Sequence, residues 1–215
     1  AELVITLRAG CKLKEVESLL AEKGQMFGFE PPYFGDDATI GGIVASGLTG
    51  PRRAFSGAIR DFILGVKLLN GRGEIVNFGG RVIKNVAGFD VSRLMVGALG
   101  TLGVLLEVSI RVIPKFEAEA TLVFEHTDVQ THIDWINQQR RLPYPISASV
   151  WYQGLTKIRL SGSQLGLDSA CEDLVITIVV NQTRPRGMRR FYFSKGNFSE
   201  TELVVHTHLH LSASF

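Results

Sequence analysis

Apolar and polar residues at the start of the chain follow the pattern of a strand and then an amphipathic helix. Residues 3–8 (LVITLR) predict a short strand, and residues 12–23 repeat their apolar positions every three to four residues, which is typical of a helix with one apolar face. That face carries Leu13, Val16, Leu19 and Leu20. Gly24 ends the helix, because glycine readily adopts the backbone conformation of a helix C-terminus. The abrupt opening in a strand predicts that a further segment precedes it in the complete protein.

The next regular pattern predicts a β-hairpin. Residues 62–69 and 74–78 are apolar runs on either side of Asn70-Gly71-Arg72-Gly73. An Asn-Gly pair between two apolar runs predicts a tight turn, because both residues tolerate positive φ. Residues 25–56, by contrast, show no clear helix or strand period and are expected to be irregular.

Residues 84–114 combine a glycine cluster with a long strand. Asp90 is expected to cap a short helix that extends to Val96, and residues 104–113 alternate as a strand that Pro114 ends. The glycines of this stretch are Gly88, Gly97, Gly100 and Gly103. Glycines at this spacing let another group approach the main chain closely. That group can be a ligand or a neighbouring turn of the protein, and the stretch alone leaves both interpretations open.

The second half of the chain predicts a smaller α+β unit. Residues 120–125 read as a strand, residues 128–140 as a helix, and residues 147–161 as a hairpin that turns at Gln153-Gly154. A proline-marked linker, LPYPIS, separates the helix from the hairpin. Trp135 and Trp151 are expected to serve the core or an interface. The predicted division is residues 1–114 and residues 115–215.

The C-terminal tail has two further clusters. Arg184, Arg186, Arg189 and Arg190 suit either an acidic partner or an exposed loop. His206, His208 and His210 alternate, so they share one face of a predicted strand over residues 203–211. Three imidazoles on one face suit zinc, but an exposed edge is the favoured interpretation, because no acidic residue that would orient the imidazoles is apparent. No metal site is predicted.

Composition and charge narrow the class of protein. The 215 residues are 45% hydrophobic and carry a formal net charge of +2, which argues against a dedicated nucleic-acid binder. Cys11 and Cys171 are far apart and form no disulfide or zinc pattern. No apolar run is long enough to span a membrane, and no signal peptide is recognisable. We therefore expect a soluble, cytoplasmic protein.

The segment Thr39-Ile40-Gly41-Gly42, followed by Ala45, Ser46 and Gly47, is a candidate anion site. Small residues at the start of a helical turn leave main-chain N–H groups uncovered, and such groups bind phosphate. The alternative is close helix packing on small residues. The standard nucleotide motifs do not occur: GxGxxG after a strand and GxxxxGK[ST] are both absent, as are GxSxG and HExxH.

Two segments resemble a known family. ATIGGIVASGLTGPRRAFSGAIRDFILGVKLLNGRGEIV (38–76) and KNVAGFDVSRLMVGALGTLGVLLEVSIRVIPK (84–115) resemble the flavin-binding domain of the p-cresol methylhydroxylase and vanillyl-alcohol oxidase type. More narrowly, they are similar to the FAD-binding E subunits of bacterial glycolate oxidases. The resemblance implies an α+β fold, the second subdomain of that FAD-binding domain, followed by a partial α+β cap domain with an unfamiliar tail.

The same resemblance implies where FAD binds. Residues that match Thr39 to Gly42 lie along the pyrophosphate and ribityl chain in the family, the segment at Gly47 and Gly57 to Asp61 continues that wall, and the GTLGV element at Gly100 to Val104 approaches the adenine end. The implied cofactor-binding residues are Thr39, Ile40, Gly41, Gly42, Ser46, Gly47, Gly57, Arg60, Asp61, Gly100, Gly103 and Val104.

Two further expectations concern this site: which cations neutralise the phosphates of FAD, and how much of the site this chain contains. Arg52, Arg53 and Arg60 are candidates to neutralise phosphate, with surface solvation as the alternative for at least one of them. Family members carry a further N-terminal subdomain whose glycine-rich loop wraps the pyrophosphate, and this chain begins after that loop. Half of the cofactor site is therefore expected to be missing from this chain.

The resemblance implies a flavin-dependent subunit of a glycolate-oxidising complex. It would oxidise a small 2-hydroxy acid to a 2-oxo acid, together with a second flavin subunit and an iron–sulfur subunit. The expected location is the cytoplasm, or the inner face of the membrane through those partners. No catalytic base is identified; His126 and His132 are expected at the surface. The alternative is a non-catalytic assembly module, or a truncated copy, whose flavin site has decayed.

Overall fold

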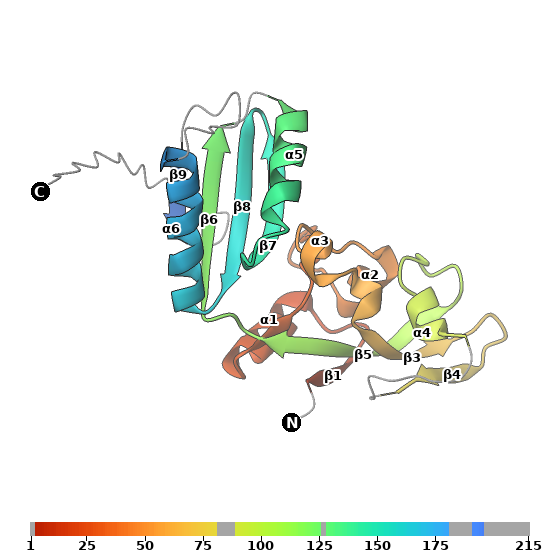
Figure 1. Cartoon of the computed structure of the whole chain (residues 1–215). Coiled ribbons are helices and arrows are strands. Elements are labelled where there is room, and N and C mark those ends of the chain that lie inside the picture. Colours follow the sequence, from red (N-terminus) through yellow and green to blue (C-terminus); the bar gives the residue numbers. More distant parts are fainter. Residues whose placement is uncertain (1–2, 81–88, 126–127, 181–190, 196–215) are drawn as a thin grey trace, which may run out of the picture. The chain divides into compact units, whose positions relative to one another are not determined.

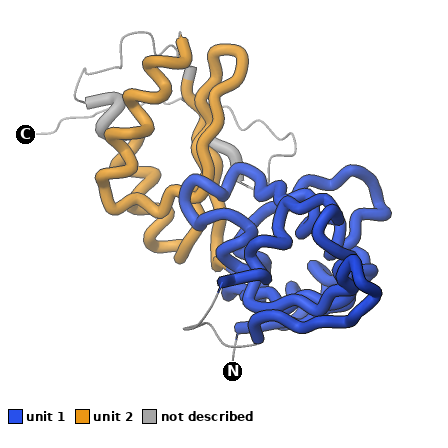
Figure 2. Tube along the Cα trace, turned by 90° about the vertical axis from the view of Figure 1, so that its right-hand side faces the viewer, with its two compact units in different colours: residues 1–115 blue, residues 116–215 orange. Residues whose placement is uncertain are grey.

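The computed structural model describes residues 3–80, 89–125, 128–180 and 191–195, and the chain divides into two compact units (Figures 1 and 2). Unit 1 comprises residues 1–115 and unit 2 comprises residues 116–215. Each unit has its own apolar core.

Unit 1 is an antiparallel sheet covered by helices. In chain order its elements are β1 (Val4–Arg8), α1 (Leu13–Glu22), β2 (Gln25–Phe27), α2 (Ile40–Ser46), α3 (Arg53–Ser56), the 3₁₀ helix η1 (Ile59–Asp61), β3 (Ile63–Leu69), β4 (Ile75–Gly79), α4 (Val91–Leu94) and β5 (Val104–Pro114). The sheet order is β1-β5-β3-β4, and β2 pairs with the last residues of β5. The long strand β5 is therefore the centre of the unit.

The alternation of β5 decides which face of this sheet is buried. Val108, Ile110 and Val112 are almost fully buried, and they pack in one core with the apolar faces of α1 and α2. The opposite face is more polar: Thr6 hydrogen bonds to Ser109 across the β1–β5 pair, with 2.9 Å between the two hydroxyl oxygens. The predicted strands, helix 12–23 and apolar face of β5 are thus confirmed.

Two local predictions in unit 1 need correction. Residues 25–56 are not wholly irregular, because they contain β2, α2 and α3. The hairpin is correct, but Gly73 rather than Asn70-Gly71 carries the positive φ, at 77°. Asn70 stabilises the turn instead through its side chain, whose Oδ1 accepts the N–H groups of Arg72 and Glu74.

Unit 2 is a four-stranded antiparallel sheet with two helices. Its elements are β6 (Ala118–Glu125), α5 (Val129–Gln139), β7 (Ile146–Tyr152), β8 (Leu155–Gly162), α6 (Gln164–Val180) and β9 (Phe191–Lys195), and the sheet order is β7-β8-β6-β9. Both helices contribute to one apolar cluster with β6 and β8, so both cover the same face of the sheet. The predicted strand, helix and hairpin are confirmed, whereas α6 and β9 were not predicted.

His132 of α5 is not the surface residue that the sequence indicated. Its side chain is only 8% exposed, and its Nδ1 lies 3.0 Å from the hydroxyl of the buried Thr156 on β8. Burial lowers the pKa of His132, because desolvation disfavours the charged imidazolium. Trp135, one turn away, packs in the core as expected, with its ring centroid 4.8 Å from that of Phe124.

Several predicted features lie outside the described residues. These are Gly88 and most of the KNVAGFD run, His126, the arginine cluster at 184–190 and the histidine strand at 203–211. Within the part of the chain that the structure describes, no helix is long and apolar enough to cross a membrane. The same residues hold no group of three or more His, Cys, Asp or Glu side chains placed to bind a metal ion.

Candidate functional site

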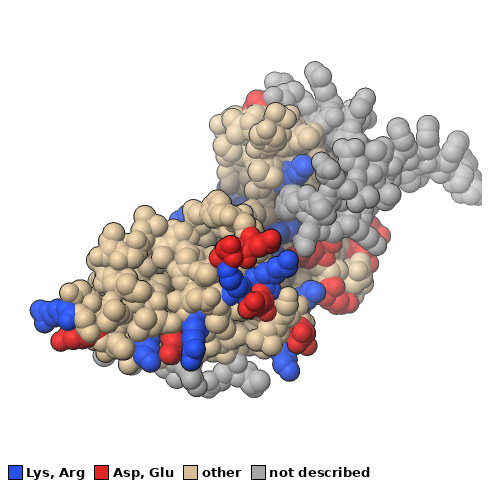
Figure 3. All heavy atoms as spheres, turned by 180° about the vertical axis from the view of Figure 1, so that it is seen from behind, with Lys and Arg blue, Asp and Glu red and all other residues tan. Residues whose placement is uncertain are grey.

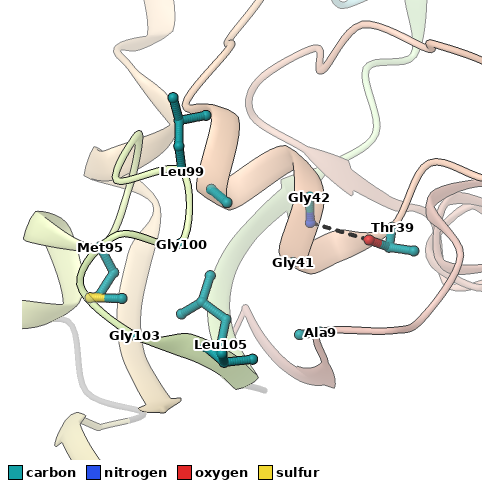
Figure 4. A pocket seen from close by; sticks show the side chains of 11 residues that line it. Ala9, Thr39, Gly41, Gly42, Met95, Leu99, Gly100, Gly103 and Leu105 are labelled. Carbon is teal, nitrogen blue, oxygen red and sulfur yellow. Dashed lines mark hydrogen bonds between the residues drawn. The ribbon is translucent and has the colours of Figure 1, made fainter. Parts of the chain in front are cut away.

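Unit 1 contains a pocket of about 330 Å³ between α2, the loop after α4 and the first residues of β5 (Figure 4). The volume lies in the range of small-molecule sites, about 300–1,000 Å³. The lining residues are Ala9, Thr39, Gly41, Gly42, Ala45, Met95, Leu99, Gly100, Gly103, Val104 and Leu105. The pocket therefore brings together the two glycine-rich segments that lie about 60 residues apart in the sequence.

Thr39 sets the position of α2 at one wall of the pocket. The hydroxyl of Thr39 accepts the N–H of Gly42 at 3.2 Å, the usual hydrogen bond of a helix N-cap (dashed in Figure 4). The first two amides of the helix are also occupied: Ile40 donates to the carbonyl of Cys11 at 2.9 Å and Gly41 to that of Ala9 at 2.7 Å. The expectation of uncovered N–H groups at this helix start is therefore wrong, because protein oxygens already accept them.

Three glycines that line the pocket meet different structural requirements. A Cβ on Gly41 would lie 2.7 Å from the Cβ of Ala9, so this glycine lets β1 and α2 approach each other. A Cβ on Gly103 would lie 2.8 Å from the carbonyl oxygen of Leu69, so this one lets β3 approach the loop. Gly100 has a φ of 77° and nothing within 4 Å of the added Cβ, so it alone of the three borders open space. Close packing thus explains Gly41 and Gly103, whereas a ligand against the backbone at Gly100 stays a prediction.

The loop after α4 is held against the C-terminal end of α2. The N–H of Gly97 donates to the carbonyl of Val44, and the N–H of Leu99 donates to that of Ala45, both at 3.0 Å. Val44 and Ala45 lie in the last turn of the helix, where carbonyls have no partner within the helix. The loop thus satisfies the helix end, and the helix fixes the loop as the second wall of the pocket.

The lining is almost entirely uncharged and apolar. None of the eleven lining residues is charged, and Thr39 carries the single polar side chain. Met95 is buried to 2% exposure and Leu105 is partly buried, and both side chains reach toward the interior in Figure 4. Thioether and leucine side chains pack well against flat aromatic rings. The pocket therefore suits an uncharged, planar part of a ligand better than a phosphate.

Six of the twelve predicted site residues do not line this pocket. Ile40 is fully buried in the core, and the hydroxyl of Ser46 donates to the carbonyl of Ile43 within α2. Gly47, with a φ of 68°, ends the helix against Gly97. The others are Gly57, Arg60 and Asp61 at η1, where the Asp61 carboxylate accepts the N–H of Ala58 at 3.0 Å. These residues shape the wall from behind or lie apart from it.

The three candidate arginines also lie away from the pocket lining. Arg52 is buried, and its guanidinium lies 3.4 Å from the carboxylate of Glu30, while its backbone N–H donates to the same carboxylate at 3.2 Å. Arg53 and Arg60 are exposed. One face of the molecule, shown in Figure 3, carries basic and acidic side chains interspersed. The described lining of the pocket thus provides no cation for a phosphate.

Sequence reasoning missed five lining residues: Ala9, Ala45, Met95, Leu99 and Leu105. Ala45 was singled out as small but not as part of a site. The apolar residues gave no signal, because a leucine or methionine between glycines is as typical of a core as of a pocket wall. One signal was present: Leu99 stands between Gly97 and Gly100 in a loop that needs positive φ.

Comparisons with known proteins agree with the flavin interpretation. The FAD binding domain family matches residues 1–79. The chain is 46% identical over 171 residues to glycolate oxidase subunit GlcE of Escherichia coli (strain K12), which covers 80% of this chain and 49% of that protein. It is 32% identical over 128 residues to glycolate oxidase subunit GlcD of Bacillus subtilis (strain 168), covering 59% of this chain and 27% of that protein. The chain therefore spans half the length of these curated relatives or less.

A solved structure supports the same fold. Alkyldihydroxyacetonephosphate synthase superposes with a TM-score of 0.65 over 84% of this chain and 38% of that one, at 18% identity. At this identity the likeness shows the fold alone. Together with the family match, it confirms the predicted fold class, an α+β FAD-binding domain of the p-cresol methylhydroxylase type.

Proposed function

Because the FAD binding domain family matches residues 1–79 and the chain is similar to a glycolate oxidase subunit, we propose that unit 1 forms one wall of the FAD site in a glycolate oxidase complex. The observation that supports this most is the pocket. It joins Thr39 to Gly42 with Gly100 to Val104, the two segments that the family resemblance assigns to the cofactor. FAD as the cofactor agrees with the matched family.

The chemistry of the lining suggests which part of FAD this wall holds. The pocket is uncharged, so it suits a ring system or the uncharged chain beside it. The first amides of α2 already donate to protein oxygens, and the lining contains no arginine among the residues that the structure describes. We therefore place the pyrophosphate outside this pocket. The twelve predicted residues remain our proposed site: six of them line the pocket, and the other six lie behind its wall or apart from it.

We propose the substrate and the reaction from the names of the relatives, which are glycolate oxidase subunits. Bound FAD supplies the two-electron oxidation of a small 2-hydroxy acid to a 2-oxo acid. The part of this chain is to bind and orient the cofactor and to exclude water from one side of it. We assign no catalytic acid or base to this chain. Unit 2 is proposed to be part of a cap domain, since it follows the flavin unit as an α+β layer.

We propose that the partners are a second flavin subunit and an iron–sulfur subunit. We also propose that the complex acts in the cytoplasm, where these partners bring it to the inner face of the membrane. Co-expression of the tagged chain with the two candidate subunits tests this. Recovery of both subunits at a fixed ratio supports the complex, and recovery of the chain alone counts against it.

The competing function is a non-catalytic assembly module that holds no flavin. Absorbance of the purified chain from the near-ultraviolet to the blue separates the two. The flavin function predicts absorption near that of free FAD, or its appearance when FAD is added and excess is removed. A colourless protein that takes up no added FAD would refute the flavin function and leave the assembly role.

A further inference from the structure

Leu99 has an unusual backbone conformation at the edge of the pocket. Among the described residues, only two non-glycines have a positive φ: Leu99 at 51° and Gln153 at 49°. A left-handed backbone is unfavourable for residues with a Cβ and most of all for bulky ones. Gln153 has a simple reason, because it occupies the two-residue turn between β7 and β8, and such turns require positive φ.

Leu99 lies in no such hairpin. Its conformation is imposed by the docking of the loop on α2, where the N–H of Leu99 donates to the carbonyl of Ala45 and the N–H of Gly97 to that of Val44. Three other positions of this loop also need positive φ, and all three are glycine: Gly97, Gly100 and Gly103. Glycine at position 99 would meet the same requirement without strain. The backbone therefore gives no reason for leucine at this position.

The surroundings of the side chain give no structural reason either. Leu99 is 73% exposed, so its isobutyl group contributes little to the core of unit 1. It nevertheless belongs to the pocket lining, at the outer end beside α2, and points away from Met95 and Leu105 (Figure 4). Val104, 58% exposed, is a second apolar residue of the same lining. The mouth of the pocket thus presents apolar side chains to whatever enters it.

We propose that Leu99 is a ligand-contacting residue, kept at a conformational cost because its side chain packs on the flat ring system of the flavin nucleotide at the mouth of the pocket. Strained residues that a surrounding structure holds in place are concentrated at functional sites. The proposal rests on the proposed function, since it names the contact that this pocket makes with its ligand.

The proposal predicts opposite effects on stability and on binding. Leu99→Gly removes both the strain and the side chain. In the absence of FAD, its melting temperature is expected to rise by roughly 2 °C, the scale of a small stabilisation in a chain of this size. Its affinity for FAD is expected to fall about tenfold, which corresponds to about 1.4 kcal/mol. A residue that served only the fold would not raise stability when it is lost.

Leu102 provides a matched control on the same loop. It is a leucine that is 49% exposed, it does not line the pocket, and it is not among the residues with positive φ. Leu102→Gly is expected to lower the melting temperature, because glycine there adds freedom to the unfolded chain without relieving strain. Leu102→Ala is expected to leave FAD affinity within twofold of the parent, whereas Leu99→Ala is expected to weaken it about tenfold, by about 1.4 kcal/mol.

The experiment is a titration of FAD into the full 215-residue chain and these four variants, with melting curves of each without FAD. Equal FAD affinity of Leu99→Ala and the parent overturns the proposal while the proposed function stands. A Leu99→Gly variant that melts below the parent overturns the claim of strain. If the parent itself takes up no FAD, the proposed function and this inference both fail.

Discussion

The pocket wall of unit 1 and the core of unit 2 show two different uses of buried space. In unit 1, glycines at Gly41 and Gly103 let strands and helix approach each other and leave an uncharged cavity beside them. In unit 2, large side chains such as Phe124 and Trp135 fill the layer between helices and sheet, with the polar pair His132–Thr156 buried at its side. Unit 2 has a smaller pocket, of about 140 Å³, whose lining between β6 and α6 includes the carboxylates of Glu119 and Asp168. The larger pocket, with an uncharged lining, lies in unit 1, and this difference is why we propose unit 1 as the unit that holds the ligand.

The largest expected effect belongs to the filled core. Phe124→Ala removes a fully buried ring that packs at a tilt of 57° against Trp135, with 4.8 Å between the ring centroids, and is expected to destabilise unit 2 by about 3–5 kcal/mol. Urea unfolding followed by tryptophan fluorescence measures this. FAD uptake by unit 1 should persist at low urea. Loss of FAD uptake under conditions where the variant remains folded would contradict the assignment of ligand binding to unit 1.

A smaller loss is expected in the wall of the pocket. Gly41→Ala brings a methyl group within 2.7 Å of the Cβ of Ala9 and is expected to cost about 1–3 kcal/mol of stability, because backbone must shift to make room. Gly10→Ala is the matched control, since nothing lies within 4 Å of its added Cβ. Equal stability of the two variants by urea unfolding would show that α2 and β1 are not as closely packed as described.

Removing the N-cap of one helix in each unit tests whether the stability of the two units depends equally on these caps. Thr39 caps α2 and Asp128 caps α5 through its hydrogen bond with Thr131 at 2.8 Å. Each change to alanine is expected to cost about 1 kcal/mol. Thr39→Ser restores the hydroxyl and should recover most of that loss. If Thr39→Ala leaves thermal stability unchanged, the cap does not position the wall.

The smallest expected effect is a pH dependence of the stability of unit 2. The folded pKa of His132 lies below its ordinary value of 6.5, so the unfolded chain binds the proton more readily. The stability that neutral His132 contributes is present above pH 6.5 and is lost as the pH falls from there through the folded pKa. His132→Gln, which keeps a polar group near Thr156, should flatten this part of the profile between pH 7 and 5. An unchanged slope of unfolding free energy against pH would contradict the assignment.

The sequence predicted the periodic elements better than the site. Residues 104–113 and 12–23 were placed correctly because their burial follows a strict period of two or of 3.6 residues. The irregular stretch around α2 was missed as structure, since its stability comes from contacts with Ala9, Cys11 and the loop at Gly97 rather than from its own pattern. Distant partners of this kind leave no trace in local periodicity.

The site residues show the same limit. Gly100, Gly103 and Val104 were placed beside Thr39 to Gly42 through the family resemblance, and the pocket brings them together. The direction of each N–H group was not predictable, because carbonyls from another strand decide whether an amide is free. His132 was misplaced for the same reason: Thr156, its partner, lies on a strand 24 residues away.

The central claim, that this pocket takes part of FAD, is tested most directly by filling the pocket. Ala45→Leu places a larger side chain in the lining on helix α2, and Ala21→Leu makes the same change on an exposed face of α1. Calorimetric titration of FAD into the full chain should give one site per chain for the parent and for Ala21→Leu, and binding weakened at least tenfold, by about 1.4 kcal/mol, for Ala45→Leu. Equal FAD affinity in all three proteins, or no binding by the parent, would contradict the claim.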